Sequence, residues 1–182
     1  MTETNPDVEQ LWAQVERARA SDPDLEAVVE ALGEQLTASA PDVIASFDRG
    51  LARVFERSYS WALWGAAYLI NGGCSDDGFD YFRGWLVAQG RAVFEAALTN
   101  PDSLADALTG VDTDEGDCEC EDILYVANDA HREQTNQDLD GESVELPALG
   151  DGWDFDDGDE MAARYPRLWA MFGWDEGDDA DD

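Results

Sequence analysis

Residues 61–90 of the chain read WALWGAAYLINGGCSDDGFDYFRGWLVAQG. Their first part is apolar on nearly every side, which predicts a buried helix over residues 60–71. The pair Gly72-Gly73 ends that helix, because glycine readily takes the left-handed conformation that closes many helices. Ser75 can then cap a second helix. The segment therefore predicts two tryptophan-rich helices that meet at a tight diglycine corner.

Helical signals continue on both sides of this corner. A proline followed by an aspartate suits the first turn of a helix, because the proline lacks an N–H and the carboxylate favours the positive end of the helix dipole. Such triplets occur at Asn5-Pro6-Asp7, Asp22-Pro23-Asp24, Ala40-Pro41-Asp42 and Asn100-Pro101-Asp102. Further helical periodicity covers residues 91–99, 121–135 and 161–172, the last interrupted by Pro166. The fold class is mostly α, a single-domain bundle of about seven to eight short helices.

The chain has 182 residues, which suits one domain. We expect that domain to span residues 1–173. It contains an acidic loop over residues 109–122 and an irregular segment over residues 136–158, with a short hairpin-like stretch around residues 143–146. Residues 174–182 are an acidic tail that lacks the apolar surface needed for order.

The charge is far from balanced. The chain has 43 acidic residues and 10 basic ones, all arginine, for a formal net charge of -33. Such a field repels nucleic acid phosphates and anionic membranes, and it attracts cations or basic protein surfaces. We therefore expect no direct nucleic acid and no membrane among the partners. Three origins of the charge stay open: adaptation to high salt or to a genome poor in lysine codons, a solvated shell that aids solubility, and imitation of a polyanion.

The first ten residues, MTETNPDVEQ, are polar, and nowhere do about 18 uncharged apolar residues run together. We expect a cytoplasmic protein. Its three cysteines are an odd number in a domain large enough to fold without disulfides, so reduced thiols are expected.

Several blocks of the sequence resemble a known family. The 61–90 block and NPDSLAD look like the signature of domain of unknown function 4240, and CEDILYVANDA and YPRLWAMF look like its weaker downstream blocks. The resemblance implies a small, helical bacterial domain, and it brings no activity with it.

The candidate binding residues gather at the corner and on the helices beside it. They are Trp64, Tyr68, Cys74, Ser75, Asp76, Asp77 and Arg83. Carboxylates at the start of a helix disfavour a phosphate there, so a small cationic ligand or an arginine of a basic protein is the better fit. A purely structural interpretation also holds, in which Ser75 caps the helix and Asp77 or Asp80 pairs with Arg83.

Other chemistry finds less support. Carboxylates beside Cys74 oppose a reactive thiolate. Cys118, Cys120 and His131 suggest zinc, but one residue between the two cysteines departs from the usual spacing of zinc ligands. Residues 136–141 match the first half of an EF-hand loop, yet its twelfth position is a proline where calcium needs a glutamate. We expect no metal and no cofactor.

Most tryptophans belong to the expected core, since Trp61, Trp64 and Tyr68 recur at helical spacing. Trp153 and Trp174 lie in polar surroundings and are candidate interface anchors.

The sequence favours a cytoplasmic binding or regulatory module with its contact site at the helix junction, residues 72–83. One alternative is a polyanion mimic that binds a basic partner. Another is a small enzyme that uses Asp76, Asp77 and Arg83, which requires the three side chains to converge in a cleft. No catalytic residue is assigned, and the oligomeric state is left open.

Overall fold

The computed structural model describes residues 5–110, 118–141 and 146–174. Within these ranges the chain is helical and has no β-strand. Ten α-helices and two 3₁₀-helices are present. They are α1 (Pro6–Arg19), α2 (Leu25–Thr37), α3 (Pro41–Ser58), α4 (Trp61–Ile70), α5 (Asp76–Ala88), α6 (Arg91–Thr99), η1 (Pro101–Ser103), α7 (Leu104–Ala107), η2 (Asp122–Leu124), α8 (Val126–Thr135), α9 (Gly158–Arg164) and α10 (Pro166–Phe172).

The all-helical class is confirmed, but the expected count of about seven to eight helices is too low. Two expected helices are each split, one into η1 and α7 and the other into η2 and α8. The last element is split as well, because Tyr165 precedes a proline and takes φ -128° and ψ 60°, outside the α region. The sequence predicts this interruption at Pro166. The other two leave the apolar periodicity almost unchanged, so the sequence pattern does not reveal them.

The Pro-Asp triplets behave largely as expected. The side chain of Asn5 accepts a hydrogen bond from the Asp7 N–H at 2.9 Å, and that of Asn100 accepts one from the Asp102 N–H at 3.3 Å. The second helix begins at Leu25 instead of Pro23, because its cap is Asp24. Side-chain caps thus fix most of these helix starts.

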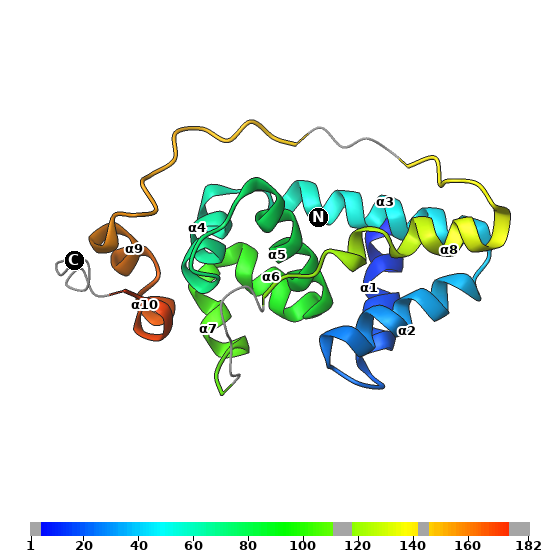
Figure 1. The fold of residues 1–182 in the computed structure, drawn as a ribbon, viewed down its shortest axis with the longest axis horizontal. Helices are drawn as coiled ribbons and strands as arrows, with labels where there is room; N and C mark the ends of the chain where they lie inside the picture. Colours follow the sequence, from blue (N-terminus) through cyan, green and yellow to red (C-terminus); the bar gives the residue numbers. More distant parts are fainter. Residues whose placement is uncertain (1–4, 111–117, 142–145, 175–182) are drawn as a thin grey trace, which may run out of the picture.

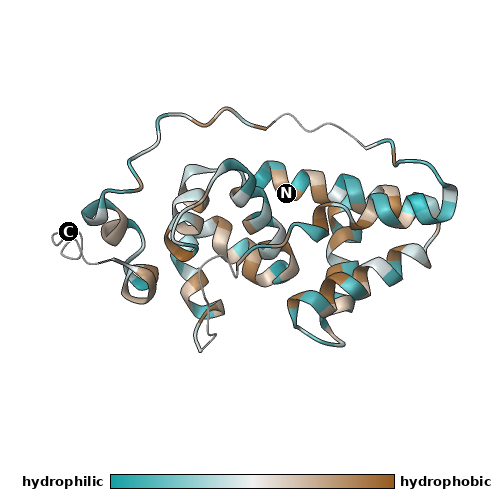
Figure 2. Cartoon of the chain, in the orientation of Figure 1, coloured by the Kyte–Doolittle hydropathy of each residue, from teal (hydrophilic) through white to brown (hydrophobic). Residues whose placement is uncertain are grey.

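The helices form an elongated body (Figure 1). Helices α1, α2, α3 and α8 pack together at one end, and α4 to α7 form the middle. Helices α9 and α10 lie at the other end, where α10 packs against α4 and α7. In Figure 2, hydrophobic and hydrophilic bands alternate around α2, α3 and α8, as in amphipathic helices that bury one side.

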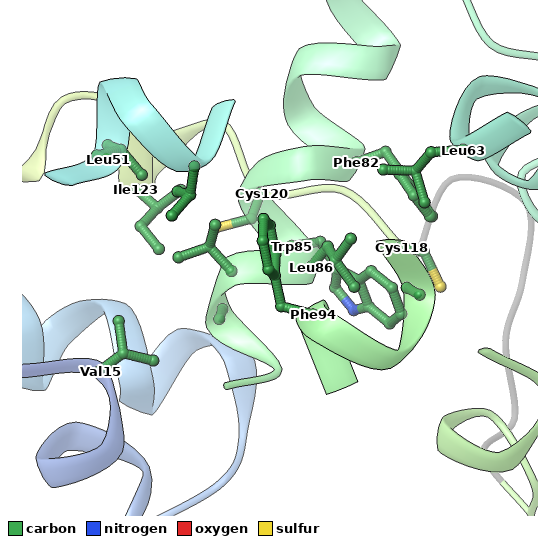
Figure 3. Close-up of a cluster of buried hydrophobic side chains, with 14 of the residues drawn as sticks. Val15, Leu51, Leu63, Phe82, Trp85, Leu86, Phe94, Cys118, Cys120 and Ile123 are labelled. Carbon is green, nitrogen blue, oxygen red and sulfur yellow. The ribbon is translucent and has the colours of Figure 1, made fainter. Parts of the chain in front are cut away.

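A continuous apolar core runs through the body. Phe82, Leu86 and Phe94 are fully buried within it (Figure 3). Cys118 and Cys120 also belong to this core, and the Cys120 N–H donates to the Tyr81 carbonyl at 2.8 Å, which holds this stretch against α5. The two cysteines expected in an acidic loop are therefore packing residues.

The connection from α8 to α9 contains neither helix nor strand in residues 136–141 and 146–157. The hairpin-like stretch expected around residues 143–146 falls mainly outside the described residues, as do residues 111–117 of the acidic loop and residues 175–182 of the tail. No helix in the described ranges is long and apolar enough to cross a membrane.

Candidate functional site

The diglycine corner has the expected form. Gly72 and Gly73 have φ of 67° and 136°, values that favour glycine, and the Gly73 N–H donates to the Tyr68 carbonyl at 2.9 Å. Ser75 then accepts a hydrogen bond from the Gly78 N–H at 3.1 Å and so caps α5. The corner fixes the start of α5 against the end of α4.

Arg83 lies inside the protein, with only 1% of its surface exposed. Its guanidinium carbon lies 4.6 Å from the ring centre of Phe55 and 4.9 Å from that of Phe79. One nitrogen donates to the Phe55 carbonyl at 2.7 Å, and another pairs with Asp80. Burial lowers the pKa of Arg83 from its ordinary value, partly offset by Asp80. Arg83 thus joins α5 to the end of α3, and it is closed to an external ligand.

Trp64 and Tyr68 are also engaged within the protein. Trp64 stacks on Phe79 with ring centres 4.7 Å apart, and its indole N–H donates to the Cys74 carbonyl at 3.0 Å. The Tyr68 hydroxyl donates to Asp156, and its ring lies 5.4 Å from that of Phe155. Both aromatic residues therefore support the corner instead of lining a free pocket.

Cys74 is half-buried beside Glu119. Burial, followed by the negative charge of Glu119, raises the pKa of the Cys74 thiol to about 12. Glu119 is half-buried too, and burial raises its pKa above the ordinary value for a glutamate. A β-carbon on Gly78 would lie 3.4 Å from a Glu119 carboxylate oxygen, so Glu119 approaches the start of α5 closely. Sequence reasoning missed Glu119, because the burial of the two cysteines on either side of it depends on tertiary packing.

Of the seven candidate residues, only Ser75, Asp76 and Asp77 are exposed. They do not converge with Arg83, whose ion pair is with Asp80. The arrangement expected for a small enzyme, two carboxylates and an arginine in one cleft, is absent from the described residues.

The exposed aspartates adjoin a second group of polar residues. Partial burial and then the charges of Glu121 and Asp77 raise the pKa of Tyr81. The Tyr125 hydroxyl lies 3.5 Å from a Glu121 carboxylate oxygen, and 50% of Tyr125 is exposed. Asp77 and Tyr81 lie one turn apart on α5, and Glu121 interacts with both Tyr81 and Tyr125. These four residues are called here the acidic tyrosine face.

An open groove of about 880 Å³ begins at Tyr125 and lies between α2 and α8. Apolar atoms of its lining come from Val29, Gly33, Ala38, Val126 and Ala130, and carboxylates come from Glu34, Asp122, Asp129 and Glu133. The only cation in this lining, Arg132, pairs with Asp138 and lies 3.8 Å from Asp129. Sequence reasoning missed the groove, because each helix alone looks like an ordinary amphipathic helix.

The described residues contain no group of three or more histidine, cysteine or acidic side chains placed to hold a metal ion. Asp138, a possible calcium ligand in the half EF-hand match, forms an ion pair with Arg132. Cys118 and Cys120 lie among apolar residues, and Figure 3 shows their sulfur atoms pointing to separate parts of that cluster. As far as the described residues reach, neither motif is arranged as a metal site.

Comparison with known proteins gives one match. No curated protein and no solved structure matches the chain. The profile of a family described as protein of unknown function, DUF4240, matches residues 7–133. That range begins in α1 and ends in α8, so it includes the corner, the acidic tyrosine face and the groove, and it leaves out α9 and α10. Because the match covers well over half of the sequence, the chain belongs to the DUF4240 family.

Proposed function

We propose that the chain is a cytoplasmic binding module that holds a basic amphipathic helix of a partner protein in the groove between α2 and α8. The observation that carries the proposal is the chemistry of the groove, where an apolar floor is bordered by four carboxylates and an exposed tyrosine. Helix-in-groove recognition uses such a floor for the apolar side of the incoming helix. The carboxylates suit lysine or arginine on the flanks of that helix.

The protein's own cations support this choice of partner, because all ten arginines are already engaged. Eight form ion pairs with carboxylates: Arg49, Arg53, Arg57, Arg83, Arg91, Arg132, Arg164 and Arg167. Arg17 bonds to Gln14 and Arg19 to the Ala88 carbonyl. With 43 acidic residues in the chain, most carboxylates have no arginine to pair with. The missing positive charge is therefore best supplied by the partner.

The acidic tyrosine face extends the groove toward the corner. Tyr125 belongs to both, and Asp77 links this face to the exposed start of α5. Tyrosine presents a large, rigid side chain with a polar end, a combination that is common in interfaces. The corner would then act as the outer part of the contact surface, through Asp76 and Asp77.

A second candidate function is supported by the net charge. A polyanion mimic binds a basic partner through its array of carboxylates and needs no groove. The small-enzyme alternative gains no support, because Arg83 is buried and both aspartates are exposed.

The test uses a designed arginine- and leucine-containing amphipathic peptide, a fluorescent label and anisotropy. Gly33→Leu fills the groove floor. A β-carbon there would lie 3.7 Å from Val126, an ordinary contact, and leucine favours a helix more than glycine does. We expect this variant to fold and to bind the peptide at least about tenfold more weakly than the wild type, since it loses the apolar contacts.

Charge is tested with a matched pair of variants. Glu34, Asp129 and Glu133 are changed to their amides in one, and the exposed residues Asp140, Asp151 and Asp159 in the other. Both variants lose three charges. Weaker binding only in the first supports the groove. Equal loss in both, with Gly33→Leu unchanged, would support the polyanion mimic instead.

A further inference from the structure

The outer side of α4 is covered by residues 149–172, called here the C-terminal segment, which lie beyond the residues that the family profile matches. The Trp61 indole N–H donates to the Gly150 carbonyl at 2.7 Å. Trp61 also meets Phe155 edge-on at 6.0 Å. A β-carbon on Gly152 would lie 2.9 Å from the Trp61 ring, so a glycine is needed for this approach. The segment thus docks on an aromatic surface of residues 7–133, the part that the family profile matches, called here the family core.

Gly65 makes room for the same segment at the middle of α4. The Tyr165 hydroxyl donates to the Ala62 carbonyl at 2.7 Å. A β-carbon on Gly65 would lie 2.6 Å from that hydroxyl oxygen and 3.1 Å from Trp153. All three atoms nearest to this position belong to the C-terminal segment. The surface of α4 is therefore shaped for these two side chains.

The family core also supplies the cap of the last helix. One carboxylate oxygen of the buried Asp102 accepts hydrogen bonds from the Arg167 and Leu168 N–H groups, each at 3.0 Å. These two residues lie in the first turn of α10, where N–H groups lack partners within the helix. Arg167 pairs in addition with Asp106. A side chain of η1 thus does for α10 what a local capping residue usually does.

The described part of the connection to the segment is largely exposed. Residues 136–141 and 146–148 are exposed apart from Leu139. Figure 1 places the end of α8 at one end of the body and α9 at the other end. The segment is therefore a docked element joined to the core by a long connection.

We propose that the surface formed by α4, η1 and α7 is a binding site for the C-terminal segment, and that it accepts this segment from a second copy of the chain as well as from its own. Every copy carries both the site and the segment, so the same contacts form within one chain or between two. The two cases differ in the effective concentration of the C-terminal segment at the site. Within one chain, the length of the connection sets that concentration. This exchange does not depend on the proposed function, because the groove lies between other helices.

The test combines two full-length variants with complementary defects. Gly65→Leu blocks the site, since the three atoms nearest to an added β-carbon all belong to the C-terminal segment. Tyr165→Ala with Leu168→Ala removes two buried side chains of the segment. It leaves the site intact, because neither residue belongs to α4, η1 or α7. Hydrogen exchange in α9 and α10 should be at least tenfold faster in each variant alone, and exchange in α1 to α3 unchanged.

Sedimentation velocity then decides the proposal. Each variant alone should be a monomer, and an equal mixture should form a heterodimer whose fraction rises with concentration. In that dimer the segment of the Gly65→Leu chain docks on the other chain, so protection of α9 and α10 returns. A mixture that stays monomeric overturns the exchange. Undisturbed protection of α9 and α10 in the Gly65→Leu variant alone overturns the docking site itself.

Discussion

Replacement of Arg83 separates what its volume contributes to stability from what its charge contributes. The side chain is 1% exposed and lies between the rings of Phe55, Tyr59 and Phe79 at 4.6 to 5.2 Å. Arg83→Ala leaves a cavity in this stack. Truncation of a long buried side chain to alanine typically costs about 2–5 kcal/mol, and we expect about 3 kcal/mol here.

Arg83→Met keeps most of the volume and removes the charge. It loses the bond to the Phe55 carbonyl and the cation–π contacts, together about 2–4 kcal/mol. It also removes the cost of burying a guanidinium, which is several kcal/mol. Two features limit the remaining loss of stability. The Asp80 side chain is 46% exposed and stays solvated, and the Phe55 carbonyl keeps a bond from the Ser58 hydroxyl at 3.2 Å. We expect a net loss within about 1 kcal/mol.

Urea unfolding followed by tryptophan fluorescence and circular dichroism measures both changes. Arg91→Met is the control. Its ion pair with Glu9 lies at the surface, so its loss should cost less than about 1 kcal/mol. If Arg83→Met loses as much stability as Arg83→Ala, the charge itself stabilises the protein and the reasoning about desolvation is wrong.

Three further predictions concern thiols, pH and salt. At about pH 8, native Cys74 should react with a thiol reagent about 10²-fold more slowly than a free thiol. Few thiolates form when the pKa is about 12, and the greater nucleophilicity of a more basic thiolate offsets only part of that loss; labelling at the free rate would contradict the burial of Cys74. Burial raises the pKa of both Cys74 and Tyr165, so the folded state holds these protons more tightly than the unfolded state does. The free energy of unfolding should therefore be highest below about pH 8.5 and fall as the pH rises toward 12. Urea titrations that show no such fall at alkaline pH would refute this. Raising NaCl from about 0.1 to 1 M should raise the urea midpoint of unfolding, since salt screens repulsion among the excess carboxylates more than it weakens exposed ion pairs. A lower midpoint would show that the ion pairs contribute more to stability than the repulsion takes away.

The corner was predictable from sequence because its signals are local. Glycines with positive φ and the Ser75 cap act within a few residues of where they occur, and the apolar stretch of α4 is long enough to identify a buried helix. Burial of Cys118 and Cys120 was not predictable in the same way. They follow a run of acidic residues, and only their packing against α5 shows that the chain turns inward there.

The role of Arg83 illustrates a different limit. Sequence spacing allowed its pair with Asp80, three residues away, and the structure has that pair. The other partners, Phe55 and Tyr59, come from the end of α3 and depend on how two helices cross. A charged residue within an aromatic helix therefore looked like part of a site, whereas tertiary packing makes it part of the core.

The groove also depends on how two helices pack, so its sequence pattern did not reveal it. Salt dependence separates binding in this groove from binding by a polyanion mimic. Attraction between the acidic surface and a basic partner weakens as salt shortens the Debye length, whichever proposal holds. An apolar floor behaves differently, because its contribution does not depend on screening. If the groove binds the partner, affinity for the amphipathic peptide should fall with salt toward a plateau, and Gly33→Leu should remove that plateau. A polyanion mimic has no such floor, so its binding should continue to fall until it is lost.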